Sequence, residues 1–302
     1  MRDNPGMFVC PATGGPLEEL YSEQADVLYP SIQGIPVLLP SPRQFLARHG
    51  PWDPTLGVAG QRQTILGVTE PDAVTPFLAP GDLGAGGRFG DFLLDLGQDT
   101  PEDWVIDKAL AHAPVGPCVD LGAGLGQMAA RMAAAQREVV ILDRSPDAVV
   151  LCRALLHGQV REALVPTHRR GCLPQSVPRP PGGRLHFAIA DACAPPLAPE
   201  SMAWIHMGGL LDVLEPEQLV QSLVQAVQRL VPAGVLSITT AYDTPGGPML
   251  PDEAPPEGEM REVLDELGLD LVEERDKVPS IRRLYDRRFE VRLVHCMVLR
   301  RR

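Results

Sequence analysis

Short apolar runs alternate with amphipathic segments from about residue 115 onward, and this alternation constrains the fold more than any other feature. Apolar runs of strand length occupy 117–121, 138–143, 184–191, 202–207 and 232–242. Segments with helical spacing occupy 128–136, 144–158, 215–231 and 259–268. Strands that alternate with helices form mostly parallel sheets covered on both faces. We therefore predict an α/β fold with a doubly wound, mostly parallel sheet.

The ends of individual elements also carry signals. Thr100 and Ser145 each precede a proline, which is the pattern of a capping residue followed by the first residue of a helix. The apolar segments 269–276 and 289–300 close the chain and predict an antiparallel pair that includes the C-terminal strand. The basic, proline-rich segment 158–183 and the acidic, proline-rich segment 243–258 interrupt the alternation, and we expect them to be an excursion near the sheet edge and a loop.

A glycine-rich turn follows the first of these strands, in the sequence "CVDLGAGLGQ" at 118–127. A turn that cradles a dinucleotide pyrophosphate has the pattern Gly-x-Gly-x-x-Gly, which would put its third glycine at Gln127. The third glycine is instead Gly126, after Gly122 and Gly124, and Asp120 precedes them. Taken alone, these glycines are also compatible with a bare tight turn.

Acidic residues end the next two strands. Asp143 follows the second strand and Asp191 the third. A carboxylate at such a strand end can accept hydrogen bonds from ribose hydroxyls. Either residue can also act as a helix or turn cap, and their joint position after the glycine turn favours the ligand-binding role.

The pattern Asp120-x-Gly122-x-Gly124-x-Gly126, followed by Asp143 and Asp191, resembles the Rossmann-like (class I) S-adenosylmethionine-dependent methyltransferases. The segment "LVPAGVLSIT" resembles a later block of the same family, with Ala233 in place of a glycine, and Ala203 stands where the family often has an acid. The resemblance implies S-adenosylmethionine as cofactor and an in-line methyl transfer. The residues that it assigns to the cofactor are Asp120, Gly122, Ala123, Gly124, Gly126, Asp143, Arg144, Asp191, Ala192, Met207 and Gly208.

Three residues are candidates for catalysis at the methyl acceptor. His206 is a candidate base, although a strand-end histidine with its hydrogen bonds satisfied is an equally good interpretation. Asp212 either faces the acceptor or occupies an exposed helix position, and Tyr242 lies at the end of the fifth strand. We predict no metal site.

Residues 1–45 predict a small β-rich unit of short strands separated by turn residues. Cys10, Pro11 and the segment "YPSIQGIPVLL" resemble a zinc-ribbon-like module that accompanies some methyltransferases. Thr13 stands where that module has its second cysteine, so we expect a version without metal, because structural zinc takes four ligands. The remaining predicted units are a helical and loop-rich cap region at 46–114 and a cofactor-binding domain at 115–302.

The composition limits the partners. The formal net charge of −12 disfavours broad binding to nucleic acid. No apolar run approaches the roughly 18 residues of a membrane span, and residues 1–30 do not have the pattern of a signal peptide, so we expect a cytoplasmic protein with no membrane partner.

We expect a small-molecule acceptor. The sequence has no Asn-Pro-Pro-Tyr-type motif after the fourth strand, which disfavours the adenine-N6 and glutamine-amide methyltransferases. It also has no Pro-Cys or Thr-Cys pair at a strand end, which a cytosine-C5 enzyme would need for its covalent nucleophile. An RNA or protein acceptor, or a non-catalytic partner subunit with this fold, is the alternative. The oligomeric state is not indicated.

Overall fold

The computed structural model describes residues 7–42, 100–160, 162–166, 172–176, 183–243, 256–285 and 288–302. Most of the predicted cap region and most of the loop predicted at 243–258 lie outside these residues. The description below therefore concerns the sheet, the helices packed on it and the N-terminal strands.

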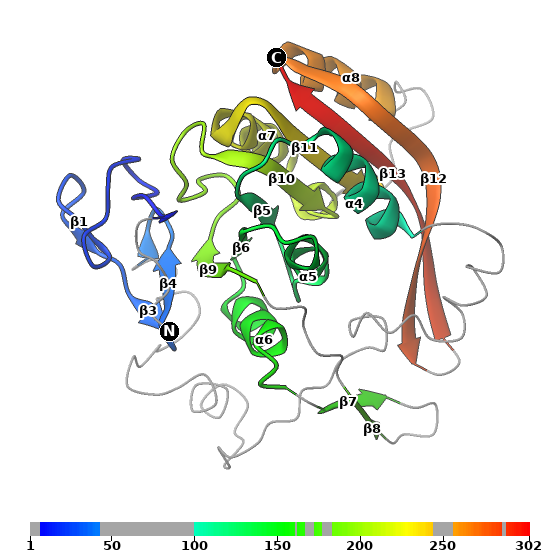
Figure 1. Cartoon of the computed structure of the whole chain (residues 1–302), viewed down its shortest axis with the longest axis horizontal. Helices are drawn as coiled ribbons and strands as arrows, with labels where there is room; N and C mark the ends of the chain where they lie inside the picture. The colour runs from blue at the N-terminus through cyan, green and yellow to red at the C-terminus, as the bar shows by residue number, and fades with distance from the viewer. Residues whose placement is uncertain are drawn as a thin grey trace.

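A nine-stranded sheet forms the centre of the molecule, in the order β12-β13-β11-β10-β5-β6-β9-β4-β3 (Figure 1). Its parallel centre contains β5 (Cys118–Leu121), β6 (Val139–Asp143), β9 (Leu185–Ala190), β10 (Met202–Gly208) and β11 (Leu230–Thr240). β13 (Arg288–Arg301) runs antiparallel between β11 and β12 (Leu269–Tyr285). The predicted mostly parallel sheet with an antiparallel C-terminal strand is confirmed.

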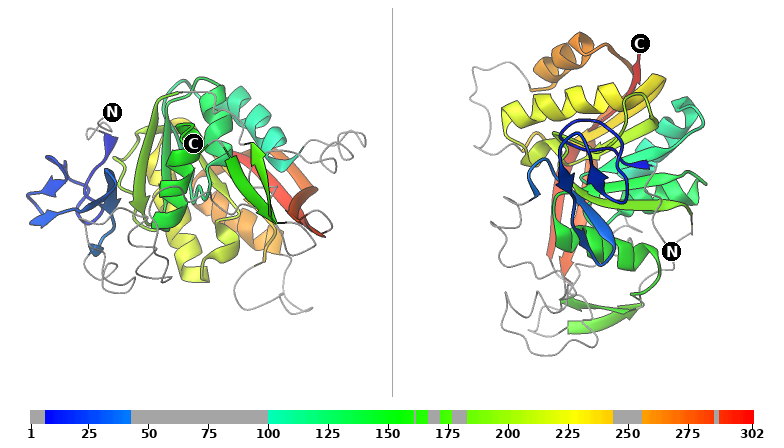
Figure 2. Two further views of the ribbon diagram at one scale, coloured as in Figure 1. Left: turned by 90° about the horizontal axis from the view of Figure 1, so that it is seen from below. Right: turned by 90° about the vertical axis from the view of Figure 1, so that its left-hand side faces the viewer.

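Helices cover both faces of the sheet (Figure 2). α4 (Pro101–His112), α5 (Gln127–Ala134) and α6 (Pro146–Leu156) pack on one face, and α7 (Pro216–Arg229) and α8 (Pro256–Glu266) on the other. The predicted caps are confirmed, since the Thr100 side chain accepts a hydrogen bond from Asp103 N–H and the Ser145 side chain accepts one from Ala148 N–H. In each helix a proline occupies the first turn, where its missing N–H costs no hydrogen bond.

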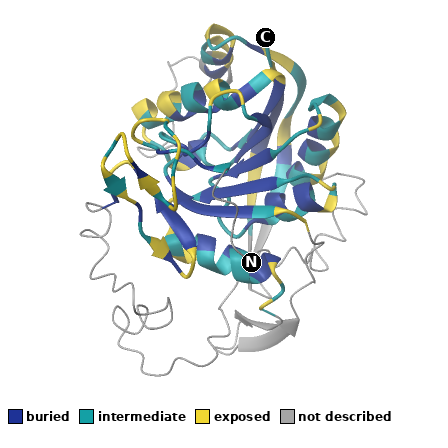
Figure 3. Ribbon diagram, turned by 60° about the vertical axis from the view of Figure 1, so that its left-hand side comes forward, coloured by how far each residue is buried: buried dark blue, intermediate teal, exposed yellow. Residues whose placement is uncertain are grey.

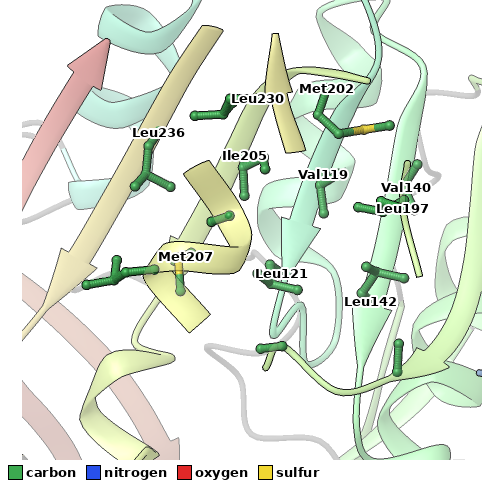
Figure 4. Close-up of a cluster of buried hydrophobic side chains, with 14 of the residues drawn as sticks. Val119, Leu121, Val140, Leu142, Leu197, Met202, Ile205, Met207, Leu230 and Leu236 are labelled. Carbon is green, nitrogen blue, oxygen red and sulfur yellow. The ribbon is translucent and has the colours of Figure 1, made fainter. Parts of the chain in front are cut away.

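The core lies on the two faces of the parallel strands, which are buried along most of their length (Figure 3). The face beneath α7 and α8 carries an aliphatic cluster drawn in Figure 4, with Val119, Leu121, Ile205, Met207 and Leu236 among its members. Successive residues of a strand point to opposite faces, so the residues between them belong to the second cluster, beneath α4, α5 and α6.

The N-terminal unit joins the main sheet. Its strands are β1 (Tyr21–Ser22), β2 (Val27–Leu28), β3 (Ser31–Ile32) and β4 (Ile35–Leu38). They form the antiparallel pairs β1–β2 and β3–β4, as expected for a small β-rich unit. β4 also pairs with β9 in parallel, through Val37 and Leu38. The unit therefore shares its hydrogen bonding with the central sheet.

Cys10, the one candidate metal-binding cysteine of this unit, is fully buried, and its thiol lies 3.2 Å from the Tyr29 hydroxyl. Burial by itself raises the pKa of Cys10, but hydrogen bonds from Ser22, Thr13 and Tyr29 lower that pKa to about 7. Hydroxyl groups thus surround this sulfur. The likeness of residues 1–45 to a zinc-ribbon-like module stays a prediction.

Two hairpins lie outside the regular alternation. The segment predicted as an excursion contains β7 (Glu162–Pro166) and β8 (Cys172–Ser176), which pair with each other in a separate two-stranded sheet. The two strands of the β12–β13 hairpin are longer than the other strands of the sheet. β11 ends at Thr240 opposite His295, whereas pairing between β12 and β13 continues from Val278–Val294 to Tyr285–Arg288. This hairpin therefore extends past the carboxyl ends of the parallel strands (Figure 1).

Within the part of the chain that the structure describes, none of the helices combines the length and apolar character needed to cross a membrane.

Helix α7 offers a direct test of the core. Leu223 is completely buried, while Val220 on the same helix is 44% exposed. We expect Leu223→Ala to lower the free energy of unfolding by about 2–5 kcal/mol, because it removes buried methyl groups and leaves a cavity. Val220→Ala should change that free energy by no more than about 0.5 kcal/mol. Urea unfolding of both variants checks the packing, and similar losses in the two would contradict it.

Candidate functional site

The candidate site lies where the connectivity of the sheet reverses direction. From β5 the chain continues through β6 to β9 on one side, and it then crosses to β10 and β11 on the other side. β5 and β10 are neighbours, paired through Val119–Ile205 and Asp120–His206. Open α/β sheets bind their ligands beyond the carboxyl ends of the strands at such a switch point. The glycine turn follows β5 at this point, and Gly208 ends β10.

The glycine turn has the backbone conformation that its residues predict. The N–H groups of Gly122 and Ala123 both donate to Leu142 O on β6, at 2.8 and 3.1 Å. Gly122, Gly124 and Gly126 have φ values of +78°, +53° and +77°, in the left-handed region that favours glycine. These hydrogen bonds hold the turn against the end of the neighbouring strand.

The three glycines differ in what surrounds them. A Cβ atom on Gly122 would lie 2.9 Å from Leu210 Cδ1, and a Cβ atom on Gly126 would overlap Cys152 Sγ of α6. A Cβ atom on Gly124 would have no neighbour within 4 Å among the residues that the structure describes. Packing within the protein therefore requires two of the glycines, whereas Gly124 meets none of the described side chains. A ligand can approach the backbone there.

Asp143 lies beside this opening. Its Oδ2 accepts a hydrogen bond from Gly124 N–H and its Oδ1 accepts one from Ser145 N–H, both at 2.8 Å. The carboxylate thus ties the glycine turn to the start of α6, as the capping interpretation expects. Each of its oxygens has a second lone pair that can accept a hydroxyl group.

Asp191 ends the adjacent strand, just beyond Ile189, which is the register partner of Asp143. Its Oδ1 accepts a hydrogen bond from Cys193 N–H at 2.9 Å, and its Oδ2 lies 3.9 Å from Arg144 Nη1. Ala192, which follows it, is buried. The structure therefore brings the glycine turn, Asp143, Arg144 and Asp191 to one edge of the sheet.

Asp120 lies beneath the turn and is only 3% exposed. Its Oδ2 accepts a hydrogen bond from Ala129 N–H of α5 at 2.9 Å. The pKa of Asp120 is raised to about 7, mainly by burial; the hydrogen bond from Ala129 N–H opposes this increase, and the charge of Asp143 adds to it. The carboxyl group is thus partly protonated near neutral pH in the absence of a cation.

Met207 and Gly208 contribute to the site in different ways. The Met207 side chain is buried in the cluster beneath α7 and α8, as Figure 4 shows, so only its backbone reaches the strand end. Gly208 leaves room for a neighbouring ring, because a Cβ atom there would lie 2.5 Å from His206 Nε2.

His206 is 3% exposed, and its Nδ1 lies 2.9 Å from Ser237 Oγ on β11. Burial lowers the pKa of His206 to about 3. An imidazole with this pKa is neutral at physiological pH and is a weak base, which favours a hydrogen-bonded histidine over the predicted base.

Asp212 lies in the short helix η3 (Leu211–Val213) and is 7% exposed. Its Oδ1 accepts a hydrogen bond from Thr240 Oγ1 at 2.5 Å, and both of its oxygens lie 3.1 Å from Ala241 N. The carboxylate therefore fastens the segment after β10 to the end of β11. Of its two predicted environments, the exposed one is wrong, because Thr240 and Ala241 cover the carboxylate.

Tyr242 follows β11, and its hydroxyl lies 2.7 Å from His295 Nδ1 on β13. His295 Nε2 lies 2.8 Å from Glu274 Oε1 on β12, and Glu274 also pairs with Arg261 of α8. Sequence reasoning missed His295 and Glu274, because neither belongs to a motif and their pairing depends on strand register. Tyr242 has a φ of +57°, an unfavourable value for a residue with a side chain.

No family model and no curated protein matches this sequence. Solved structures resemble it over part of the chain. An S-adenosylmethionine-dependent methyltransferase from Methanosarcina mazei is 14% identical with a TM-score of 0.47, and the match covers 65% of this chain and 96% of that one. The N-methyltransferase NodS from Bradyrhizobium japonicum WM9, in complex with S-adenosyl-L-homocysteine, is 13% identical with a TM-score of 0.48, over 72% and 89% of the two chains.

A third match is 1,6-didemethyltoxoflavin-N1-methyltransferase from Burkholderia thailandensis. It is 16% identical with a TM-score of 0.45, and the match covers 76% of this chain and 93% of that one.

The pKa of Asp120 predicts a specific pH dependence of stability. The pKa lies near 3.8 in an unfolded chain and about 7 in the folded protein, so the folded state binds an extra proton between these values. The contribution of Asp120 to the free energy of unfolding is therefore fully present below pH 3.8 and is lost as the pH rises through about 7. Asp120→Asn keeps an oxygen for Ala129 N–H and removes the charge, so above about pH 7 it should be more stable than the wild type, by a few kcal/mol.

Urea unfolding of both proteins at a series of pH values measures this difference. Asp107→Asn is the matched control, since the Asp107 side chain is 74% exposed on α4. A stability difference for Asp120→Asn that does not change with pH would contradict the raised pKa.

The surroundings of the glycines predict unequal costs of substitution. Gly124→Ala should cost about 1–2 kcal/mol, from the left-handed backbone alone. Gly126→Ala should cost about 1–3 kcal/mol more, because its methyl group overlaps Cys152. The double variant Gly126→Ala/Cys152→Ala should recover part of that loss. Equal destabilisation by the two single variants, measured by urea unfolding, would show that the overlap is not real.

Proposed function

We propose that this protein is an S-adenosylmethionine-dependent methyltransferase that acts on a small molecule. The observation that carries the proposal is the opening at Gly124, in the turn that follows β5 at the switch point, with Asp143 of β6 at its edge and Asp191 after the next strand. A backbone accessible at the turn, with carboxylates at the next two strand ends, suits a nucleoside joined to a small polar group.

The charges at the turn favour a cationic ligand over a pyrophosphate. Asp120, Asp143 and Asp191 surround it, and Arg144 is paired with Asp191. Gly124 N–H, the kind of group that would bind a phosphate, already donates to the Asp143 carboxylate. S-adenosylmethionine carries a sulfonium and an ammonium group, so acids at this position attract it where they would repel a pyrophosphate.

Each residue then has a defined task. Asp143 would accept hydrogen bonds from the ribose hydroxyls, Asp191 and Ala192 would lie on the adenine side, and the backbone of Gly122, Ala123, Gly124 and Gly208 would border the amino-acid and sulfonium parts. The cofactor, when bound, supplies an electrophilic methyl group. The protein contributes mainly proximity and orientation, because the methyl group moves in line between two held reactants.

Tyr242 is the candidate that best accounts for removal of a proton from the acceptor. Its hydroxyl can donate to His295 Nδ1 while its oxygen accepts a hydrogen bond from the acceptor. His295 in turn is oriented by the Glu274 carboxylate, which would stabilise a protonated imidazole. The positive φ of Tyr242 costs about 1–3 kcal/mol, and strain of this kind is concentrated at functional sites.

The polar groups near Tyr242 favour a small acceptor of mixed polarity. Glu290 hydrogen-bonds Arg292 on the extended part of β13 and raises the pKa of Arg292, and the charges of Asp243 and Asp212 raise it further. Charges of both signs therefore lie around the end of β11. The net charge of −12 argues against a nucleic-acid acceptor.

Calorimetric titration tests the cofactor. S-adenosylmethionine and S-adenosylhomocysteine should bind the wild type, and Asp143→Ala should weaken binding at least about 10-fold, since it removes the acceptor of two ribose hydroxyls. Asp107→Asn, a change on the exposed side of α4, should leave the affinity unchanged. The absence of binding to the wild type, with intact folding by circular dichroism, would sink the proposal.

Labelled cofactor tests the acceptor class and Tyr242 together. S-adenosylmethionine with a deuterated methyl group is incubated with the protein and a cell extract, and label is sought in small-molecule, RNA and protein fractions. We expect label in small molecules and a rate about 10²–10⁴-fold lower for Tyr242→Phe, with cofactor affinity unchanged. Label confined to RNA or protein would refute the small-molecule acceptor, and full activity of Tyr242→Phe would refute its role as proton acceptor.

A further inference from the structure

The hydrogen bonds around Ser237 determine which nitrogen of His206 carries the proton. Trp204 Nε1 lies 2.8 Å from Ser237 Oγ, and an indole N–H can only donate. Ser237 is fully buried, so its own hydroxyl proton also needs an acceptor. His206 Nδ1 lies 2.9 Å from the same oxygen. The arrangement that satisfies all three groups has Ser237 donate to Nδ1, which leaves the proton of the neutral ring on Nε2.

The Nε2–H of His206 has no hydrogen-bond partner among the residues that the structure describes. Among the described residues, the side-chain nitrogen and oxygen atoms that are sealed from solvent and have no hydrogen-bond partner are His186 Nδ1 and Arg229 Nε. His206 Nε2 is not one of these sealed atoms, so it keeps some contact with accessible space, although the residue is only 3% exposed. An N–H that lacks a protein partner in a nearly buried ring can donate to a ligand that binds beside it.

The position of this nitrogen links it to the candidate site. The ring extends along β10 toward Gly208, whose missing side chain leaves the space that Nε2 faces. Asp120 is the register partner of His206 on β5, so both side chains lie on the same face of the sheet at the switch point. One is a hydrogen-bond donor and the other is an acidic acceptor, and they come from neighbouring strands.

We propose that the Nε2–H of His206 donates to the carboxylate of the amino-acid part of the ligand, with the Asp120 carboxylate on the ammonium side. A zwitterion presents both groups at one carbon atom, and adjacent strands present their complements. The inference rests on the proposed function, and it gives His206 a binding task in place of base catalysis. Ser237 and Trp204 act as positioning residues, because they hold the ring and its tautomer.

Two ligands separate this role from a structural one. S-adenosylhomocysteine contains the amino-acid group, whereas 5′-methylthioadenosine has the same nucleoside and a thioether without it. Calorimetry on His206→Phe should show affinity for S-adenosylhomocysteine reduced about 10- to 100-fold, the effect of losing a hydrogen bond to a charged group. Affinity for 5′-methylthioadenosine should stay within about twofold. His206→Gln, which keeps an N–H donor at a similar distance, should recover part of the loss.

Nuclear magnetic resonance of the wild type gives a readout that needs no variant. The ¹⁵N shifts of His206 should report a neutral ring protonated at Nε2, and the Nε2–H resonance should move with S-adenosylhomocysteine and not with 5′-methylthioadenosine. A ring protonated at Nδ1, or equal responses to the two ligands, would overturn the inference.

The outcomes also separate the inference from the proposed function. Binding of both ligands with equal losses in His206→Phe, or with no loss for either, refutes the role of His206 and leaves the cofactor site standing. Failure of the wild type to bind either ligand refutes both.

Discussion

The parallel pairing of β5 with β10 is the constraint on which the rest of the structure depends. It joins two halves of the sheet whose connections run in opposite directions, so the loops that leave these two strands diverge. Gly122 N–H donates a hydrogen bond to Leu142 O, and the Leu210 side chain packs against Gly122. Only a residue without a side chain and with a positive φ fits between them. The opening at Gly124 exists because its neighbours on either side are fixed in this way.

Buried polar groups at this switch point lower the stability of the fold. Asp120 is almost fully buried with its pKa raised, and His206 is neutral with its pKa lowered, both mainly through burial. Neither shift is useful for stability, since each records the cost of desolvating a charge. In the proposed function part of this cost is recovered on binding, because the ligand's ammonium group lies toward the Asp120 carboxylate and its carboxylate accepts from His206 Nε2–H. Stability and function therefore oppose each other at Asp120.

Much of the fold and part of the site could be predicted from the sequence, for identifiable reasons. Apolar runs and capping residues such as Thr100 and Ser145 act locally, so they located the strands and helices. The carboxyl ends of parallel strands meet at one edge, so Asp143 and Asp191 were expected to lie together. The pairing of β4 with β9 and the network of Tyr242, His295 and Glu274 depend on register between distant segments, which local patterns do not encode. The role of His206 likewise depends on Ser237, a residue without any motif.

A crystal structure of the protein grown with S-adenosylhomocysteine tests the central claim most directly. We predict that the ribose lies on Asp143, the adenine beside Asp191 and Ala192, and the amino-acid group between Gly124 and the strand end at Gly208, with its carboxylate on His206 Nε2. A ligand bound elsewhere, or bound at this edge with its amino-acid group directed away from Asp120 and His206, would contradict this prediction.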